Sequence, residues 1–325
     1  MAAAPGSGQI AFIRATGAED AHVCLLELDS GQVSTLDQSP CVGAPVWSPD
    51  GAWLAFETTE GNGTSLRVVR GDGSEARTVG GAHGWSGWPS WSADGTSLAY
   101  VAAADSGSEI LVYDMASGTE TRWGTGNAAL MSPVWMAPDM LMAIGVVGAE
   151  DTVATDIFLV TREDATRLPG DVLAPDNPYV EWRLASNPRH AAIAFESNDG
   201  GDREIFVLSL KRKGLMDVSN HRAADWNPVW TPDGRALAFE SFRGGRRGIY
   251  KGFPDRTRVL PIAVDADSDN WHPSWSPDGQ WIAHVSTRTG DNELFVTSAN
   301  GDTSKRLTEH PGPDYAPAWR PGDRQ

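Results

Sequence analysis

The chain has 325 residues, of which 40% are hydrophobic and 21% charged, a composition typical of a globular protein. Its formal net charge of −17 argues against nucleic acid as a partner, because a phosphate backbone is bound by clustered Lys and Arg. No apolar run is long enough to cross a bilayer, so the sequence predicts no membrane span.

A motif built around one tryptophan recurs along the chain. Its clearest copies read PVWSPDG at residues 45–51, PVWTPDG at 228–234 and PSWSPDG at 273–279. Successive copies are 44, 44, 47, 48, 45 and 44 residues apart, and a four-stranded propeller blade needs about 40–45 residues. We therefore predict one blade for each repeat. The blades begin near Trp47, Trp91, Trp135, Trp182, Trp230, Trp275 and Trp319, the last of which is joined with residues 9–40.

Each repeat predicts four strands in a fixed order. The first strand carries the tryptophan and ends in the Ser-Pro-Asp-Gly turn, where proline presets φ and glycine accepts a positive φ. The second strand follows at once, as at residues 54–56 and 237–239, and the third is the next apolar run, as at 110–113 and 205–208. The fourth is a short edge segment such as 305–308, whose charges discourage edge-to-edge aggregation.

The two ends of the chain complement each other. Residues 10–13, 23–26 and 33–36 predict a second, third and fourth strand that lack a first, whereas Trp319 marks a first strand with almost no chain after it. Pairing the C-terminal first strand with the N-terminal second strand closes the ring and satisfies both edges. The sequence thus predicts an all-β fold, a seven-bladed β-propeller of four-stranded blades that forms a single domain over residues 1–325.

The Trp-Ser-Pro-Asp-Gly pattern, followed by a strand such as Leu-Ala-Phe, resembles the repeat of the TolB-like β-propellers over nearly the whole chain. Typical TolB propellers have six blades, whereas the repeat count here predicts seven. Proteins with this repeat include protein-binding modules, gating domains of peptidases and seven-bladed oligogalacturonate lyases. The resemblance therefore implies the fold and leaves both a binding and an enzymatic role open.

Residues just before each first strand are expected to surround the mouth of the central channel, where loops on a rigid scaffold converge. Three consecutive repeats place a large aromatic residue four positions before the repeat tryptophan. We interpret these rings as a binding surface; the alternative is that they wedge neighbouring blades, with the adjacent Asp and Asn as turn residues. The predicted ligand-binding residues are Trp226, Trp271, Tyr315, Trp88, Tyr179, Asp225, Asn227, Asp269 and Asp314.

The same region carries groups suited to acid–base chemistry. If the protein is an enzyme, the expected catalytic residues are His272, His284, Arg288 and Glu240. His284 takes a position that holds Phe or Tyr in other repeats, so a role in the core is its alternative. No nucleophile elbow, zinc-ligand spacing, P-loop or dinucleotide fingerprint occurs. The lyases with this repeat hold a metal through histidines, but no such motif matches this chain residue by residue.

We expect a binding module that recognises a small molecule (a sugar or a cationic group) or a peptide in an aromatic, acidic mouth. The alternative is a lyase-like or hydrolase-like enzyme acting on glycans. No cofactor is expected, with a divalent metal ion as the alternative, and the chain is expected to be a monomer with Cys24 and Cys41 as free, buried thiols. The first residues lack the basic and apolar regions of a secretion signal, so we expect a cytoplasmic protein, or a secreted or periplasmic mature form without its leader.

Overall fold

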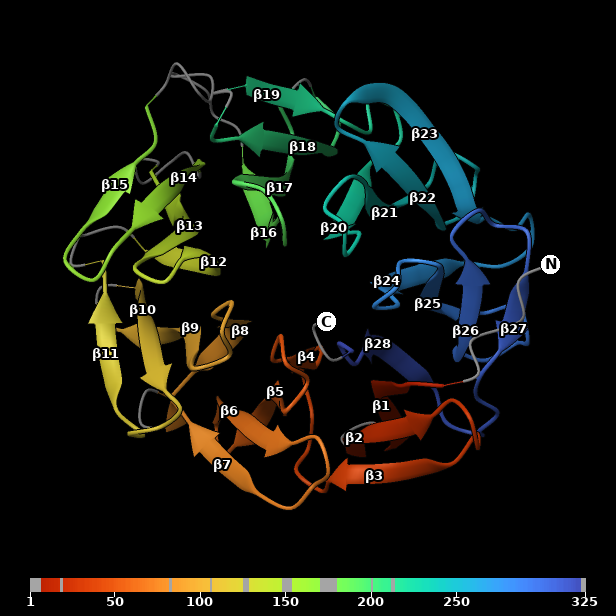
Figure 1. Ribbon diagram of the computed structural model, residues 1–325, viewed down its shortest axis with the longest axis horizontal. Helices are drawn as coiled ribbons and strands as arrows, with labels where there is room; N and C mark the ends of the chain where they lie inside the picture. The colour runs from red at the N-terminus through yellow and green to blue at the C-terminus, as the bar shows by residue number, and fades with distance from the viewer. Residues whose placement is uncertain are drawn as a thin grey trace.

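The protein is a ring of seven antiparallel sheets, each of four strands, which confirms the predicted seven-bladed β-propeller (Figure 1). The computed structural model describes residues 7–17, 20–81, 84–105, 107–124, 129–147, 154–169, 180–199, 201–211 and 214–322, without the side chain of residue 257. Within these ranges there is no α-helix, and hence no helix with the length and apolarity to cross a membrane.

The four strands of a blade follow one another in order from the channel to the outer rim of the disc (Figure 1). The innermost strands of blades 1–7 are β4 (Val46–Trp47), β8 (Ser86–Trp91), β12 (Leu130–Ala137), β16 (Glu181–Ser186), β20 (Asp225–Trp230), β24 (Asn270–Trp275) and β28 (Asp314–Trp319). The second strands, in the same order, are β5 (Trp53–Glu60), β9 (Ser97–Ala104), β13 (Met140–Val146), β17 (Ala192–Ser197), β21 (Leu237–Ser241), β25 (Trp281–Ser286) and β1 (Gln9–Gly17). The third strands are β6 (Gly63–Arg70), β10 (Gly107–Asp114), β14 (Thr155–Val160), β18 (Glu204–Ser209), β22 (Gly248–Phe253), β26 (Glu293–Ser298) and β2 (Asp20–Glu27). The outermost strands are β7 (Ala76–Val79), β11 (Glu120–Trp123), β15 (Ala165–Arg167), β19 (Gly214–Asp217), β23 (Arg256–Ala263), β27 (Ser304–Arg306) and β3 (Val33–Asp37).

Blade 7 closes the ring, as the complementary ends of the sequence predict. Strand β28 pairs antiparallel with β1, with Ile10 opposite Trp319 and Arg14 opposite Asp314. The Arg14 guanidinium donates two 2.8 Å hydrogen bonds, from Nε and Nη2, to the two carboxylate oxygens of the buried Asp314. Two parallel charge-assisted bonds fix both distance and orientation, so this pair sets the register of the closing strands.

The Ser-Pro-Asp-Gly turn is held by its own side chains. In blade 1, Ser48 Oγ donates to Asp50 Oδ1 and accepts a 2.9 Å hydrogen bond from the backbone N–H of Trp53. Asp50 Oδ1 also accepts from the N–H of Ala52 at 3.0 Å, and Gly51 adopts a φ of 68°. A residue with a Cβ is strained at that φ, which explains why glycine ends the motif.

Repeat tryptophans of five blades tie their blade to the one before it. The indole N–H of Trp91 donates to the carbonyl of Val46 at 3.1 Å, and that of Trp275 donates to the carbonyl of Val229 at 3.2 Å. In both cases the acceptor is the residue immediately before the repeat position of the preceding blade. Buried indoles normally find such a partner, so these bonds add direction to the apolar packing between blades.

The register of the fourth repeat differs from the one expected from the sequence. The indole of Trp230 donates to the carbonyl of Ala185 at 3.0 Å, so the repeat position in blade 4 is Ser186 and not Trp182. Trp182 instead occupies the position four residues earlier, level with Trp226 in the next blade. The turn after Ser186 is closed by Asn187, whose Oδ1 accepts hydrogen bonds from two backbone N–H groups.

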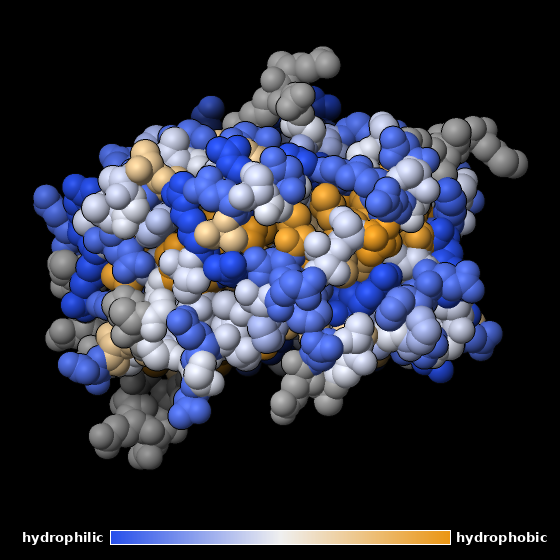
Figure 2. All heavy atoms as spheres, turned by 90° about the horizontal axis from the view of Figure 1, so that it is seen from below, coloured by the Kyte–Doolittle hydropathy of each residue, from blue (hydrophilic) through white to orange (hydrophobic). Residues whose placement is uncertain are grey.

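The apolar core lies between blades. At the junction of blades 3 and 4, where no repeat tryptophan is available, the partly buried Met136 and Leu168 pack against a buried cluster that includes Phe195 and Ile144. Methionine is unbranched and fills irregular gaps well. In the edge-on view of Figure 2, polar residues lie toward both faces of the disc, and apolar residues are visible between them. Cys24 and Cys41 are free and buried, as expected.

Candidate binding site at the channel mouth

The innermost strands carry a β-bulge three residues before the repeat position. Pairing with the second strand shifts there, for example between Trp226 and Val229 and between Trp271 and Ser274. A non-glycine residue with positive φ is uncommon, and it persists where the surroundings hold it. Six blades nevertheless place one at this position: Trp88, Ser132, Arg183, Asn227, His272 and Ala316, with φ between 41° and 57°.

A glutamate from the preceding blade holds several of these bulges. Glu57 accepts a 2.8 Å hydrogen bond from the backbone N–H of Trp88, and Glu196 accepts one of 2.7 Å from that of Asn227. Glu240, which is fully buried, accepts one of 2.8 Å from the N–H of His272. These glutamates occupy equivalent places on the second strands. They therefore act as positioning residues for the channel-side residue of the next blade.

The bulge residues of blades 4 and 6 are coupled electrostatically. The charge of Arg183 in blade 4 is one of the causes that lower the pKa of His272 in blade 6. Burial is the main cause that lowers the pKa of His272, and its Nδ1 is buried without a hydrogen-bond partner among the described residues. The imidazole is therefore neutral at pH 7, with one ring nitrogen unpaired.

An arc of half-buried aromatic rings accompanies the bulges. The position one residue before each bulge holds Trp182, Trp226, Trp271 and Tyr315 in four consecutive blades. Trp226 packs edge-on against the exposed Phe242, with ring centroids 5.4 Å apart. The guanidinium of Arg203 lies 3.7 Å from the ring centroid of Trp182, and that of Arg247 lies 5.6 Å from that of Trp271. Each of the four aromatic residues is the second residue of its innermost strand, whereas Trp226, Trp271 and Tyr315 had been expected just before the strands.

The carboxylates predicted to make the mouth acidic are engaged within the protein. Asp225 forms an ion pair with Arg243 at 3.0 Å, and Asp314 forms one with Arg14. Glu240 accepts from Arg247 Nε at 2.7 Å and from Asn227 Nδ2 at 2.7 Å. Neutralised and buried carboxylates do not attract a cationic ligand strongly.

Asp269 and Arg288 are likewise held by neighbouring groups. Asp269 is partly exposed and lies 3.2 Å from Arg246. Arg288 donates to Asn270 Oδ1 at 3.1 Å and to Asp265 Oδ2 at 3.0 Å. Tyr179 lies outside the described residues.

His284 lies in the interior of blade 6, in the position that other blades give to an aromatic residue. Its Nε2 lies 2.8 Å from Thr297 Oγ1, and its ring stacks on Phe295 with centroids 6.2 Å apart. Complete burial lowers the pKa of His284 to about 4. The structure thus supports a role of His284 in the core of the blade. In this respect His284 differs from His272, whose Nδ1 has no hydrogen-bond partner among the described residues.

Two residues of the site were missed in the sequence, Trp182 and Arg183. Trp182 was assigned as a repeat tryptophan, which displaced the repeat position in the first strand of the fourth repeat by four residues. The distance to the second strand carries the correct signal, since Trp47 and Trp230 precede Leu54 and Leu237 by seven residues and Ser186 precedes Ile193 by the same number. Among the described residues, no three His, Cys, Asp or Glu side chains gather to hold a metal ion.

The fold and the mouth together define a seven-bladed β-propeller with a polar and aromatic channel entrance. No protein-family model matches the chain, and no curated protein matches its sequence. The structure is similar to that of TolB from Acinetobacter baumannii, with a TM-score of 0.63 and 18% identity over 98% of this chain and 68% of that one. The β-propeller domain of the trilobed protease from Pyrococcus furiosus gives a TM-score of 0.70 at 12% identity over 94% of each chain.

An oligogalacturonate lyase from Vibrio parahaemolyticus has a similar fold as well, with a TM-score of 0.62 and 14% identity over 94% of this chain and 87% of that one. Similarity at such low identity establishes the fold alone. The fold is that of a seven-bladed β-propeller, similar to the propellers of these proteins, and the function has to be argued from the site.

Proposed function

We propose that the protein is a binding module that takes a sugar unit of a glycan in the mouth of its channel. The observation that carries the proposal is the pairing of two rows of side chains on blades 4, 5 and 6. One row is aromatic, with Trp182, Trp226 and Trp271 half-buried; the other offers hydrogen-bonding groups on Arg183, Asn227 and His272. Aromatic faces with a few polar groups of fixed orientation are the usual composition of a small-molecule site.

The charges of the mouth favour a ligand rich in hydroxyl groups over a cationic one. Asp225, Asp314 and Glu240 are paired with arginines, so they have little capacity left for an ammonium or guanidinium group. The guanidinium of Arg183 is exposed and has no hydrogen bond or ion pair among the described residues. It is a donor that suits the oxygen atoms of a sugar.

The test is a screen of neutral and acidic oligosaccharides on a glycan array, followed by calorimetry with the tightest binder. Replacing both Trp226 and Trp271 with alanine should weaken binding about tenfold or more, because two aromatic faces are lost. The matched control is Trp53→Ala, since Trp53 is also half-buried and stacked with guanidinium groups, 4.9 Å from Arg70 and from Arg77. Equal affinity in the double variant and the control would show that the aromatic arc is structural.

Catalysis in the same mouth is a second candidate, and His272 is the observation that favours it. A neutral imidazole with a free, buried nitrogen is suited to accept a proton from a bound substrate. Oligosaccharides that bind would then be cleaved, and new reducing ends would accumulate with time. His272→Gln should abolish this cleavage while binding persists, and metal analysis before and after chelation would tell whether a divalent ion takes part.

A further inference from the structure

A cavity lies on the face opposite the channel mouth. It is formed by the turns between first and second strands, at residues 187–192, 231–236 and 278–280, and by the turns between third and fourth strands of blades 4 and 5. It therefore crosses the end of blade 5 and reaches from blade 4 to blade 6. Its volume is about 960 Å³, which is the size of a site for a small organic molecule.

The lining contains a lysine in a position that is apolar in every other blade. Lys251 lies opposite Ala238 in the register of β21 and β22. The residue opposite the equivalent alanine is Leu25, Val68, Val112, Phe158, Val207 or Val296 in the other blades. A half-buried lysine costs stability relative to valine, so its presence needs an explanation outside the packing of the blade.

The ammonium group of Lys251 is only weakly compensated inside the protein. Its Nζ lies 5.0 Å from the ring centroid of Trp275 and 5.7 Å from that of Phe253. Over the part of the chain that the structure describes, it has neither a hydrogen bond nor an ion pair. Burial lowers the pKa of Lys251, and the charge of Asp233 opposes this shift.

The acidic side chains of the cavity are already in use. Asp233 and Asp278 close the turns, accepting hydrogen bonds from Thr231 Oγ1 at 2.6 Å and from Ser276 Oγ at 2.5 Å. Asp255 forms an ion pair with Arg256 at 3.2 Å. Five Lys and Arg side chains line the cavity against these three aspartates, so the cations are in excess in a protein of net charge −17.

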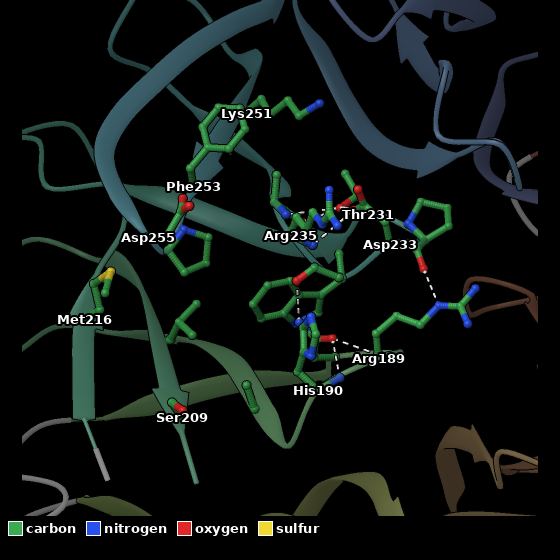
Figure 3. Close-up of a pocket in the computed structure, with 18 of the residues that line it drawn as sticks. Arg189, His190, Ser209, Met216, Thr231, Asp233, Arg235, Lys251, Phe253 and Asp255 are labelled. Carbon is green, nitrogen blue, oxygen red and sulfur yellow. Dashed lines mark hydrogen bonds between the residues drawn. The ribbon is translucent and has the colours of Figure 1, made fainter. Parts of the chain in front are cut away.

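Part of the cavity wall is apolar, with Leu215, Met216 and Phe253 among the lining residues. Figure 3 shows Met216 and His190 of blade 4 along one side and Phe253, Lys251 and Arg235 of blade 5 along the other. Met216 and its neighbour Leu215, on the outermost strand β19, are 40% and 37% exposed and belong to the exposed large apolar residues of the described chain. A ligand that covers them must itself be apolar.

We infer that this cavity binds an organic anion, a carboxylate or phosphate group carried on an apolar body. The anionic group lies between Lys251 and the exposed Arg235, and the apolar body covers Met216, Leu215 and Phe253. Neutralising a half-buried ammonium with a charged partner is a strong, short-range interaction, so the affinity depends on Lys251 more than on the outer cations. This site is independent of the proposed function of the channel mouth.

Titration calorimetry with dodecanoate and dodecyl phosphate tests the inference, with dodecyl maltoside and dodecyltrimethylammonium as neutral and cationic controls, all below their micellar concentrations. We expect binding of at least one anion and none of the controls, and the two anions distinguish a carboxylate site from a phosphate site. Absence of binding by both anions, or equal binding of all four compounds, would overturn the inference.

Variants locate the binding site. Lys251→Val restores the residue that most blades have and should weaken anion binding about tenfold or more, and Arg235→Gln, at an exposed position, should weaken it several-fold. The matched control is Lys305→Val, because Lys305 is exposed on β27 and does not line the cavity. Binding should persist in the Trp226→Ala/Trp271→Ala variant, which separates this site from the mouth. Unchanged affinity in Lys251→Val and Arg235→Gln would place the anion elsewhere.

Discussion

The carboxylate of Glu240 in blade 5 accepts a 2.8 Å hydrogen bond from the backbone N–H of His272 in blade 6. The same carboxylate accepts hydrogen bonds from Asn227 Nδ2 and Arg247 Nε, both at 2.7 Å. One buried side chain therefore binds two neighbouring channel residues, Asn227 and His272, and also forms an ion pair with Arg247. Glu57 makes the corresponding bond to the N–H of Trp88 at 2.8 Å, without an arginine partner among the described residues.

This difference predicts unequal costs for the same substitution. Glu240→Gln leaves the Arg247 guanidinium without its carboxylate and should lower the free energy of unfolding by about 3 kcal/mol. Glu57→Gln weakens only a hydrogen bond at a half-buried site and should cost about 1 kcal/mol. Urea unfolding followed by circular dichroism measures both. Equal losses would mean that the ion pair of Glu240 contributes nothing.

Glu204 should make stability depend on pH. Burial, together with the adjacent Asp225 carboxyl, raises the pKa of Glu204 to about 8 from an ordinary value of 4.5. Its counterpart Glu293 is paired with Arg306, but the residue equivalent to Arg306 in blade 4 is Asp217. The folded protein thus holds a proton that the unfolded chain releases above about pH 4.5. The stabilisation is complete below that pH and is lost progressively as the pH rises to about 8.

Thermal melting between about pH 5 and pH 9 checks this expectation. Glu204→Gln cannot ionise, so it should flatten the decline and raise the melting temperature most at the alkaline end. Glu181, whose pKa burial raises to about 7, should leave a smaller residual decline. The control Glu293→Gln breaks the ion pair with Arg306 and should lower the melting temperature instead. An unchanged pH profile in Glu204→Gln would show that this carboxyl is ionised in the folded protein.

Two tryptophans provide a test of the bonds between blades. Trp230→Phe removes the indole N–H that donates to Ala185, and it leaves that carbonyl without this partner, so we expect a loss of about 1–2 kcal/mol. The indole N–H of Trp123 is buried and has no partner among the described residues. Trp123→Phe should therefore cost less or even stabilise the protein. Chemical unfolding of both variants measures the two losses in the free energy of unfolding. A larger loss in Trp123→Phe than in Trp230→Phe would contradict the role given to the indole hydrogen bonds.

The closing blade depends on the pair of Arg14 and Asp314. Asp314→Asn converts a buried ion pair with two 2.8 Å bonds into a neutral contact, and it should cost about 3 kcal/mol. The control is Asp302→Asn at an exposed turn, where a change within about 0.5 kcal/mol is expected. Hydrogen exchange should show the loss of protection first in β1 and β28, because Arg14 and Asp314 join these two strands. Uniform loss over all blades would instead indicate that the ring unfolds as one unit.

Much of this fold could be predicted from local patterns of the sequence. The tryptophan spacing and the turn chemistry predict seven blades, and the incomplete first and last repeats predict the pairing of β28 with β1. The first strand of the fourth repeat was misaligned because Trp182 was taken for the repeat tryptophan. Ser186 and Asn187 stand at the correct distance from the second strand, but they are not the residues of the motif. The site was predicted less well. The glutamate of one blade and the bulge of the next are 31 or 32 residues apart, and no local pattern reveals that their atoms touch.

The carboxylates of the mouth show the same limit. The sequence places Asp225, Asp314 and Glu240 at the ends of strands, which is where an acidic binding surface would be expected. Whether such groups face a ligand or an arginine of the protein depends on side chains contributed by other strands, such as Arg243, Arg14 and Arg247. The carboxylates expected to make the mouth acidic are thus paired, and the aromatic rings and the Arg183 guanidinium are the groups left without such partners.

Because the bulges of blades 2, 5 and 6 are each held by the glutamate of the blade before, the single blade is not the smallest unit that can be exchanged between propellers of this kind. A transplanted blade would bring its channel residue but leave behind the carboxylate that orients it. A recombinant ring should retain its ligand only when blades are moved as adjacent pairs, with the cut placed before the strand that carries the glutamate.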